Sequence, residues 1–204
     1  MIKYPNGKTV TTKVTAPIEN KKKPVSAKLH LSAMNRGMNL EEDINLSNEY
    51  YKDHGLCLIT KRPTPINVVK VDYSKGAIIT NAYFEKQSTT DYNGVYMGKD
   101  IDFEAKSTQS KTSFPLSNIP KQQIDHLKKV IAHGGIAFFV IEFVKNNEET
   151  YLIDASIIID FYENRKRQSI PYNDIKNLGS LIKRGYAPRL DFLPIIKEKY
   201  FTSK

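Results

Sequence analysis

Cysteine is almost absent from this sequence, since Cys57 is the single one among 204 residues. One cysteine excludes an intrachain disulfide and a cysteine-rich zinc site, and it fits a protein of the reducing cytosol. Cys57 stands within the apolar run 56–59, so we interpret it as a small buried hydrophobic residue rather than as a nucleophile.

Long hydrophobic runs are also missing. The longest apolar stretch, residues 136–141, ends at Glu142 and is far shorter than the roughly 18 residues that a membrane helix needs. Residues 1–8 do not have the apolar centre of a signal peptide. We therefore expect a cytoplasmic protein that has no membrane segment.

Acidic side chains are scarce near the N-terminus. The chain has 31 Lys and Arg against 22 Asp and Glu, a net charge of +9, and residues 1–36 hold eight basic side chains against one acidic one. This segment carries +7 of the net charge, which favours a polyanionic partner. It also contains Pro5, Pro17 and Pro24 and few periodic apolar residues, so we predict a flexible basic arm over residues 1–33.

The remaining residues, 34–204, are long enough for one sizeable core and are predicted to form a single domain. Helical periodicity, with Asn39 as the first N-cap, predicts helices at residues 40–51, 121–132, 156–166 and 190–200. Strand patterns occur at residues 56–60, 66–71, 77–84, 93–97, 100–106, 136–143 and 151–154. This order predicts an α/β fold with a mixed central β-sheet flanked by helices.

Two pairs of these strands are predicted to form hairpins. The first hairpin covers residues 66–84, and the second has its turn at Gly98 and Lys99.

The strand at residues 100–106 alternates apolar and charged side chains. Asp102, Glu104 and Lys106 share one face, which we expect to line a cleft while the apolar face joins the core. Because the hairpin turn brings the preceding strand alongside, Asp91 can reach the charged face. Two carboxylates and an ammonium would then converge.

A hard divalent ion such as Mg²⁺ prefers oxygen ligands, and the carboxylates of Asp91 and Glu104 with the hydroxyl of Thr89 could supply them. Such an ion activates water and polarises a phosphodiester, while Lys106 would stabilise the charge that develops on phosphorus. The alternative is a solvated edge strand in which Glu104 and Lys106 form a weak ion pair, and the spacing alone does not separate the two.

Seven segments along the chain share the pattern of one nuclease family: residues 1–8, 35–38, 61–65, 88–94, 101–106, 111–116 and 185–189. Residues 91–106 resemble the PD-(D/E)xK nuclease core, and the chain as a whole resembles the RecU-type Holliday junction resolvases. Thr90 departs from the superfamily pattern, which has proline before the first acid, but it matches the resolvase branch.

The resemblance implies a restriction-endonuclease-like core that resolves four-way DNA junctions by paired symmetric nicks during homologous recombination and DNA repair. It further implies that Mg²⁺, for which Mn²⁺ can substitute, is held by Thr89, Asp91, Glu104 and Gln123. Lys106 takes the role of stabilising the transition state. Without the resemblance, Gln123 would be interpreted as an exposed surface glutamine.

Two further residues have an implied role and an ordinary alternative. Glu41 resembles the acidic residue that related nucleases present from their first helix, where it would act in catalysis by anchoring a second metal or the water network. Its alternative is an acid that complements the helix dipole. Arg36 could contact a DNA phosphate or merely extend the basic arm.

The hairpin at residues 66–84 resembles a protruding stalk that enters the open centre of a junction. Lys70, Tyr73, Lys75 and Tyr83 are its candidate DNA-binding residues, with the aromatic rings stacking on unpaired bases. The alternative is an ordinary packed hairpin, which we favour for Tyr83 and Phe84 near its base.

Partners follow from the same resemblance. Two symmetric cuts require two active sites, so we expect a homodimer on branched DNA. A noncatalytic junction-binding protein that bridges DNA and modulates a recombinase is the second hypothesis, and a nuclease that acts on ordinary duplex is the third. The four histidines do not have the spacing of metal ligands and are interpreted as incidental: His30, His54, His126 and His133.

Overall fold

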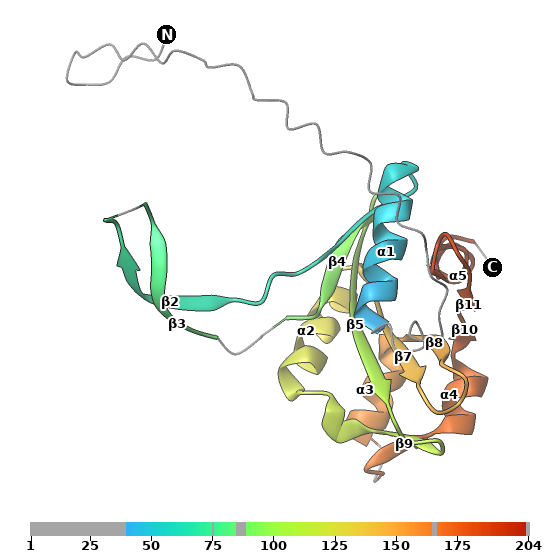
Figure 1. Cartoon of the computed structure of the whole chain (residues 1–204). Helices are drawn as coiled ribbons and strands as arrows, with labels where there is room; N and C mark the ends of the chain where they lie inside the picture. Colours follow the sequence, from blue (N-terminus) through green and yellow to red (C-terminus); the bar gives the residue numbers. More distant parts are fainter. Residues whose placement is uncertain (1–39, 75, 85–88, 165–166, 203–204) are drawn as a thin grey trace. The chain divides into compact units, whose positions relative to one another are not determined.

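A computed structural model describes residues 40–74, 76–84, 89–164 and 167–202 (Figure 1). The predictions for the arm at residues 1–33, for Arg36, for Asn39 and for Lys75 lie outside the described residues. Within the described ranges, no helix is both long enough and apolar enough to cross a membrane.

Helices and groups of strands follow one another along the chain. They are α1 (Leu40–Asp53), β1 (Leu58–Lys61), β2 (Ile66–Asp72), β3 (Ile78–Phe84), β4 (Tyr92–Tyr96), β5 (Lys99–Thr108), β6 (Ser113–Pro115), the short 3-10 helix η2 (Leu116–Asn118), α2 (Lys121–Ala132), β7 (Ile136–Phe143), β8 (Glu149–Asp154), α3 (Ala155–Asn164), β9 (Ser169–Pro171), α4 (Tyr172–Leu178), β10 (Ser180–Leu181), β11 (Lys183–Arg184), β12 (Leu190–Asp191) and α5 (Leu193–Phe201).

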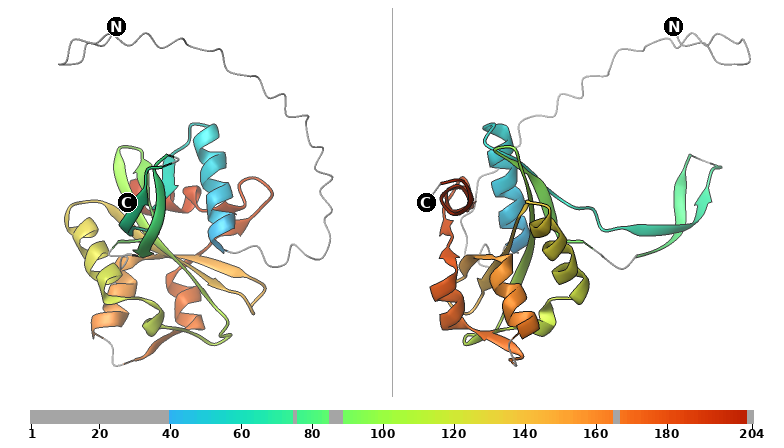
Figure 2. Two further views of the ribbon diagram at one scale, coloured as in Figure 1. Left: turned by 60° about the vertical axis from the view of Figure 1, so that its left-hand side comes forward. Right: turned by 180° about the vertical axis from the view of Figure 1, so that it is seen from behind.

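Six strands form the central sheet, in the order β1-β4-β5-β7-β8-β10. The β5–β7 pair is parallel and is bridged in sequence by α2, whereas the other pairs are antiparallel. The sheet is therefore mixed, with helices on both of its faces (Figure 2), as the sequence predicted.

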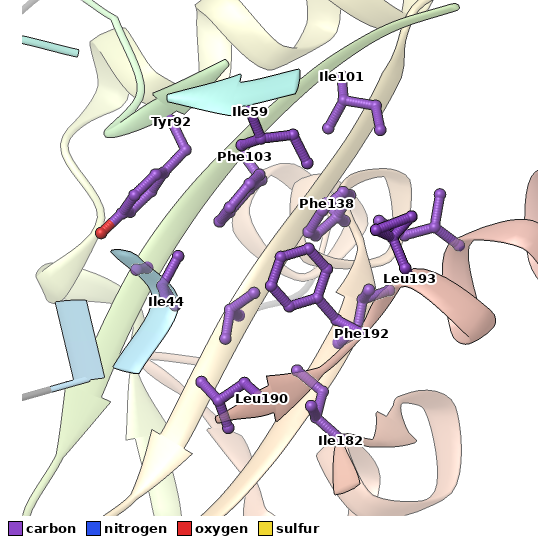
Figure 3. Close-up of a cluster of buried hydrophobic side chains, with 14 of the residues drawn as sticks. Ile44, Ile59, Tyr92, Ile101, Phe103, Phe138, Ile182, Leu190, Phe192 and Leu193 are labelled. Carbon is purple, nitrogen blue, oxygen red and sulfur yellow. The ribbon is translucent and has the colours of Figure 1, made fainter. Parts of the chain in front are cut away.

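Strand β7 shows how the sheet separates two hydrophobic cores, because all of its residues are buried. Alternate side chains, such as Phe138, join a first core with residues of α1 and α5 (Figure 3). The side chains between them, such as Phe139, join a second core with residues of α2, α3 and α4. In the first core, the ring of Phe103 stacks on that of Phe138 with centroids 4.6 Å apart.

Several boundaries differ from the sequence predictions. The last helix starts at Leu193 rather than at residue 190, because residues 190–191 pair with β11 as strand β12. The β4–β5 turn is at Met97 and Gly98 rather than at Gly98 and Lys99. Both turn residues have positive φ, 48° and 79°, which a two-residue hairpin turn of type I′ requires.

The short elements β6, β9, α4 and β10 to β12 were not predicted. They have between two and seven residues, which is too few for hydrophobic periodicity to be recognised.

The hairpin of β2 and β3 is a separate two-stranded sheet whose register runs from Ile66 opposite Phe84 to Asp72 opposite Ile78. All seven residues of β3 are exposed. The interpretation of Tyr83 and Phe84 as packed residues is wrong, since they are 60% and 78% exposed. The hairpin does not bury these rings within the described chain, so they are available to a partner.

Candidate active site

Sheet register brings Asp91 and Glu104 together. Strands β4 and β5 pair with Tyr92 opposite Phe103, so the residue before Tyr92 faces the residue after Phe103. The backbone N–H of Asp91 donates to Oε2 of Glu104 at 3.1 Å, and the N–H of Ala105 donates to Oδ2 of Asp91 at 3.4 Å. The predicted convergence of the two carboxylates is confirmed.

Helix α2 covers the charged face of β5. Gln123, in its first turn, donates from Nε2 to Oε1 of Glu104 at 2.6 Å. Glu104 is fully buried and Asp102 is only 2% exposed. The expectation that this face lines an open cleft is therefore wrong for both acids, because the helix that provides Gln123 also closes over them. Gln123 itself is buried rather than an exposed surface glutamine.

Lys106 completes the group on the same face of β5. Its ammonium lies 2.6 Å from Oε1 of Glu104, and its side chain is partly exposed. Strand β5 has β4 on one side and β7 on the other, which excludes the alternative of a solvated edge strand. We refer to Asp91, Glu104, Lys106 and Gln123 as the Glu104 site.

The electrostatics of the Glu104 site are unbalanced. Burial and, after it, the nearby carboxylate of Asp91 raise the pKa of Glu104, and Lys106 lowers it only in part, so that it stands at about 8. The buried carboxylate of Glu104 thus lies between the carboxylate of Asp91 and the ammonium of Lys106. A bound cation would offset both the burial and the repulsion.

The available ligands fit a hard divalent cation. Oε1 of Gln123 is buried and has no hydrogen-bond partner in the described structure, which leaves an amide oxygen free beside Glu104. Thr89 is partly exposed and lies two residues before Asp91. Among the described residues, no group of three or more His, Cys, Asp or Glu is arranged to hold a metal. Two carboxylates with amide or hydroxyl oxygens are the donors that Mg²⁺ accepts.

Glu41 lies in the first turn of α1 and forms an ion pair with Lys61 at the surface. The hydroxyl of Tyr92 donates to the backbone oxygen of Glu41 at 3.2 Å. Burial raises the pKa of Tyr92, and the carboxylates of Glu41, Asp91 and Glu104 raise it further. Tyr92 thus links the start of α1 to the site, because its hydroxyl bonds to Glu41 and its backbone directly follows Asp91.

Sequence reasoning missed a second polar group on β5. The carboxylate of Asp102 accepts hydrogen bonds from Arg62 at 2.5 Å, from His126 at 3.1 Å and from the hydroxyl of Thr90. The interpretation of His126 as incidental overlooked this contact. Spacing could have revealed it, because His126 follows Gln123 by three residues on one helix while Asp102 precedes Glu104 by two on one strand.

Three of the predicted DNA-binding residues are described, and all belong to the β2–β3 hairpin or its turn. Lys70, Tyr73 and Tyr83 are exposed, with Tyr73 at 76%. Lys70 and Tyr83 belong to a different sheet from the Glu104 site, and Tyr73 follows the end of β2.

The amino-acid sequence is similar to that of known proteins over nearly its whole length. The family model described as Recombination protein U (RecU) matches residues 35–198. A Holliday junction resolvase RecU of Geobacillus sp. (strain WCH70) is 47% identical over 207 residues, which cover 99% of both chains. Proteins with the same name from Geobacillus kaustophilus and Bacillus cytotoxicus are 46% and 47% identical, and the matches cover 98% or more of each chain.

Proposed function

The chain belongs to the Recombination protein U family, and we propose that it is a Mg²⁺-dependent endonuclease that resolves four-way DNA junctions by paired, symmetric nicks. Its place would be homologous recombination and DNA repair. The observation that carries the proposal is the Glu104 site, where two carboxylates, a buried amide oxygen and an ammonium meet.

Each residue of the site has a distinct task in this proposal. Asp91 and Glu104 bind the cation, with the oxygens of Gln123 and Thr89 as further ligands. The bound ion supplies Lewis-acid stabilisation of the phosphodiester and activates water, and Mn²⁺ can replace Mg²⁺ in this role. Lys106, held against Glu104, places its ammonium where negative charge grows on the phosphate. Glu41, at the start of α1, orients water.

Junction preference belongs, in this proposal, to the β2–β3 hairpin. Its exposed Tyr73 and Tyr83 stack on unpaired bases at the crossover, while Lys70 and Lys75 contact phosphates. Arg36 and the basic residues near the N-terminus add charge that holds DNA without base specificity. The exposed aromatic rings support this division because base stacking needs a free ring face.

Two nicks on opposing strands need two sites, so we propose a homodimer on each junction. A mass of twice 23.3 kDa by light scattering is the expected result.

The direct test uses a labelled four-way junction and a linear duplex, each with Mg²⁺ or with EDTA. We expect paired nicks in the junction only, and only with Mg²⁺. Asp91→Asn should abolish cutting, whereas Asp125→Asn, on the exposed side of α2, should cut like the wild type. Undiminished cutting by Asp91→Asn would refute the site, and equal cutting of duplex would refute the junction preference.

The noncatalytic alternative, a junction-binding protein that modulates a recombinase, predicts a different result in the same cutting assay. It expects tight junction binding and no Mg²⁺-dependent nick from the wild type. The complete Glu104 site argues against it, because DNA binding alone gives no reason to bury the carboxylate of Glu104 against that of Asp91.

The hairpin is tested by Tyr73→Ala and Tyr83→Ala. Each should weaken junction binding by roughly 1 kcal/mol, or about fivefold in Kd, because a stacking surface is lost. Tyr186→Ala is the matched control, since this tyrosine is 81% exposed and lies outside the hairpin. An equal loss from all three substitutions would remove the special role of the hairpin.

A further inference from the structure

Asp102 is a buried acid beside the Glu104 site that the proposed mechanism does not use. It lies on β5 two residues before Glu104, on the same face. Its carboxylate accepts hydrogen bonds from Arg62 at 2.5 Å, from His126 at 3.1 Å and from the hydroxyl of Thr90. We refer to Asp102, Arg62, Thr90 and His126 as the Asp102 cluster.

Two members of this cluster stand on the two connections to the β2–β3 hairpin. Arg62 follows β1 and precedes β2, while Thr90 follows β3 and precedes Asp91. The backbone N–H of Arg62 also donates to the backbone oxygen of Asp91 at 2.7 Å. One carboxylate therefore fixes the incoming and the outgoing connection side by side, next to a proposed metal ligand.

The third member joins the cluster to the helix of the other proposed ligand. His126 lies three residues after Gln123 on α2, so both side chains project from the same face of the helix. Helix α2 thus contacts β5 twice, through Gln123 to Glu104 and through His126 to Asp102. A shift of Asp102 would therefore displace side chains that belong to α2 and to both connections.

We propose that Asp102 is a positioning residue that sets the hairpin connections relative to the metal ligands, so that DNA held by the hairpin presents one defined phosphodiester to the Glu104 site. The inference rests on the proposed function. A buried carboxylate with three polar partners permits few alternative geometries, because each lost hydrogen bond leaves a charge unpaired. The position of the phosphodiester relative to the Glu104 site matters, since a misplacement of about 1 Å at reacting atoms lowers the rate on the order of 100-fold.

The experiment compares five full-length variants with the wild type on one four-way junction: Asp102→Asn, Arg62→Gln, Arg62→Lys, the Asp102→Asn/Arg62→Gln double variant, and Asp125→Asn as the control. Asp102→Asn keeps the size of the side chain and one acceptor oxygen. Asp125 is also an α2 acid, but its side chain is 46% exposed and pairs with Lys121. Three quantities are measured: the junction Kd with Ca²⁺ in place of Mg²⁺, the single-turnover cutting rate at saturating protein with Mg²⁺, and the nucleotide position of every cut. Thermal unfolding identifies the variants that are folded.

The expected result separates rate and position from binding. Arg62→Gln and Asp102→Asn keep the Kd within about threefold, lower the rate by roughly 10- to 100-fold and spread the cuts over neighbouring phosphodiesters. The double variant is no worse than the worse single variant, because both substitutions break one interaction. Arg62→Lys recovers most of the rate and the sharp cut position, and Asp125→Asn matches the wild type.

Other results overturn the inference. A raised Kd with an unchanged rate at saturation would make Arg62 a DNA contact. Slower cutting at an unchanged position, with additive single effects, would make the Asp102 cluster an ordinary part of the core. If Asp102→Asn does not fold, the two Arg62 variants decide by the same criteria. A wild type that binds the junction and never cuts it would refute the proposed function and this inference together.

Discussion

Two clusters of charge in this molecule differ in how their buried acids are paired. In the Glu104 site, the carboxylates of Asp91 and Glu104 lie together, and the ammonium of Lys106 pairs with Glu104. In the other cluster, which we call the Asp43 cluster, two buried acids meet two guanidiniums: Asp43, Glu142, Arg184 and Arg189. The more exposed Glu148 also lies 3.9 Å from Arg184.

The Asp43 cluster joins distant parts of the fold. Arg184 donates to Asp43 at 2.6 Å and to Glu142 at 2.5 Å, and Arg189 donates to Asp43 at 3.0 Å. These contacts link α1 to β7 and to the C-terminal segment. Both buried acids pair with arginine, so removing one partner would leave a buried charge unpaired.

The difference in pairing between the two clusters indicates which buried acid is suited to bind a cation. Around Glu104, burial and the carboxylate of Asp91 outweigh the ammonium of Lys106, and the pKa of Glu104 rises to about 8. A buried acid with a raised pKa costs stability when it is ionised, so its presence points to a bound cation. Substitutions in the two clusters should therefore change different properties of the protein.

The largest effect is expected from Glu104→Gln. The substitution removes a proposed metal ligand and should lower the single-turnover cutting rate by about 10³-fold or more, with junction binding retained. Glu142→Gln is the matched control in the Asp43 cluster, and it should lower the melting temperature while folded protein cuts at nearly the wild-type rate. Equal losses of cutting from both substitutions would abolish the distinction between the clusters.

Asp43→Ala should have the largest effect on stability. It leaves the guanidiniums of Arg184 and Arg189 without their shared acid, and we expect the free energy of unfolding to fall by about 3–5 kcal/mol. Urea denaturation followed by circular dichroism measures the change. A loss below about 1 kcal/mol would show that the Asp43 cluster contributes little.

Mg²⁺ should stabilise the protein in a pH-dependent manner. The pKa of Glu104 is raised above its ordinary 4.5 to about 8, so metal-free protein loses stability as pH rises from the lower value through the higher one. Binding of Mg²⁺ requires the deprotonated carboxylate, so the affinity should increase up to about pH 8.

At a Mg²⁺ concentration of about 100 Kd, the gain in stability would be about 2.7 kcal/mol. Melting curves with Mg²⁺ and with EDTA, recorded at about one pH unit to either side of 8, measure it. The gain should vanish in Glu104→Gln and persist in Glu142→Gln. A gain that does not depend on pH would place the ion elsewhere.

The smallest effect on stability is expected from Glu41→Gln. Its partner Lys61 and Glu41 itself are both about 40% exposed, and an exposed pair contributes less than about 1 kcal/mol. The cutting rate should still fall by about tenfold if Glu41 orients water, which corresponds to about 1.4 kcal/mol. An unchanged rate would leave Glu41 with only its place at the start of α1.

The Glu104 site was predictable because its contacts are short in sequence and follow the strand period. Asp91 and Glu104 are 13 positions apart and meet through one hairpin register. Gln123 was assigned only by resemblance, since no local pattern says which face of β5 a later helix will cover. The same limit hid the burial of Asp102 beneath α2.

The Asp43 cluster was beyond sequence reasoning for a related reason. Asp43 and Arg184 are 141 positions apart, and neither lies in a pattern that specifies a partner. An acid in the first turn of α1 looks like a response to the helix dipole. Only the tertiary fold shows that Asp43 is 1% exposed and paired with two arginines.

Strands β1 and β4 are direct neighbours, with Lys61 paired to Tyr92, although the β2–β3 hairpin lies between them in the chain. The hairpin is therefore an insertion in what would otherwise be a simple β1–β4 turn. Its length and sequence can diverge without changing any pair of the six-stranded sheet, because an insertion at a turn costs the rest of the fold little. The β2–β3 hairpin and the six-stranded sheet that carries the Glu104 site can thus evolve, or be engineered by grafting, as separate modules.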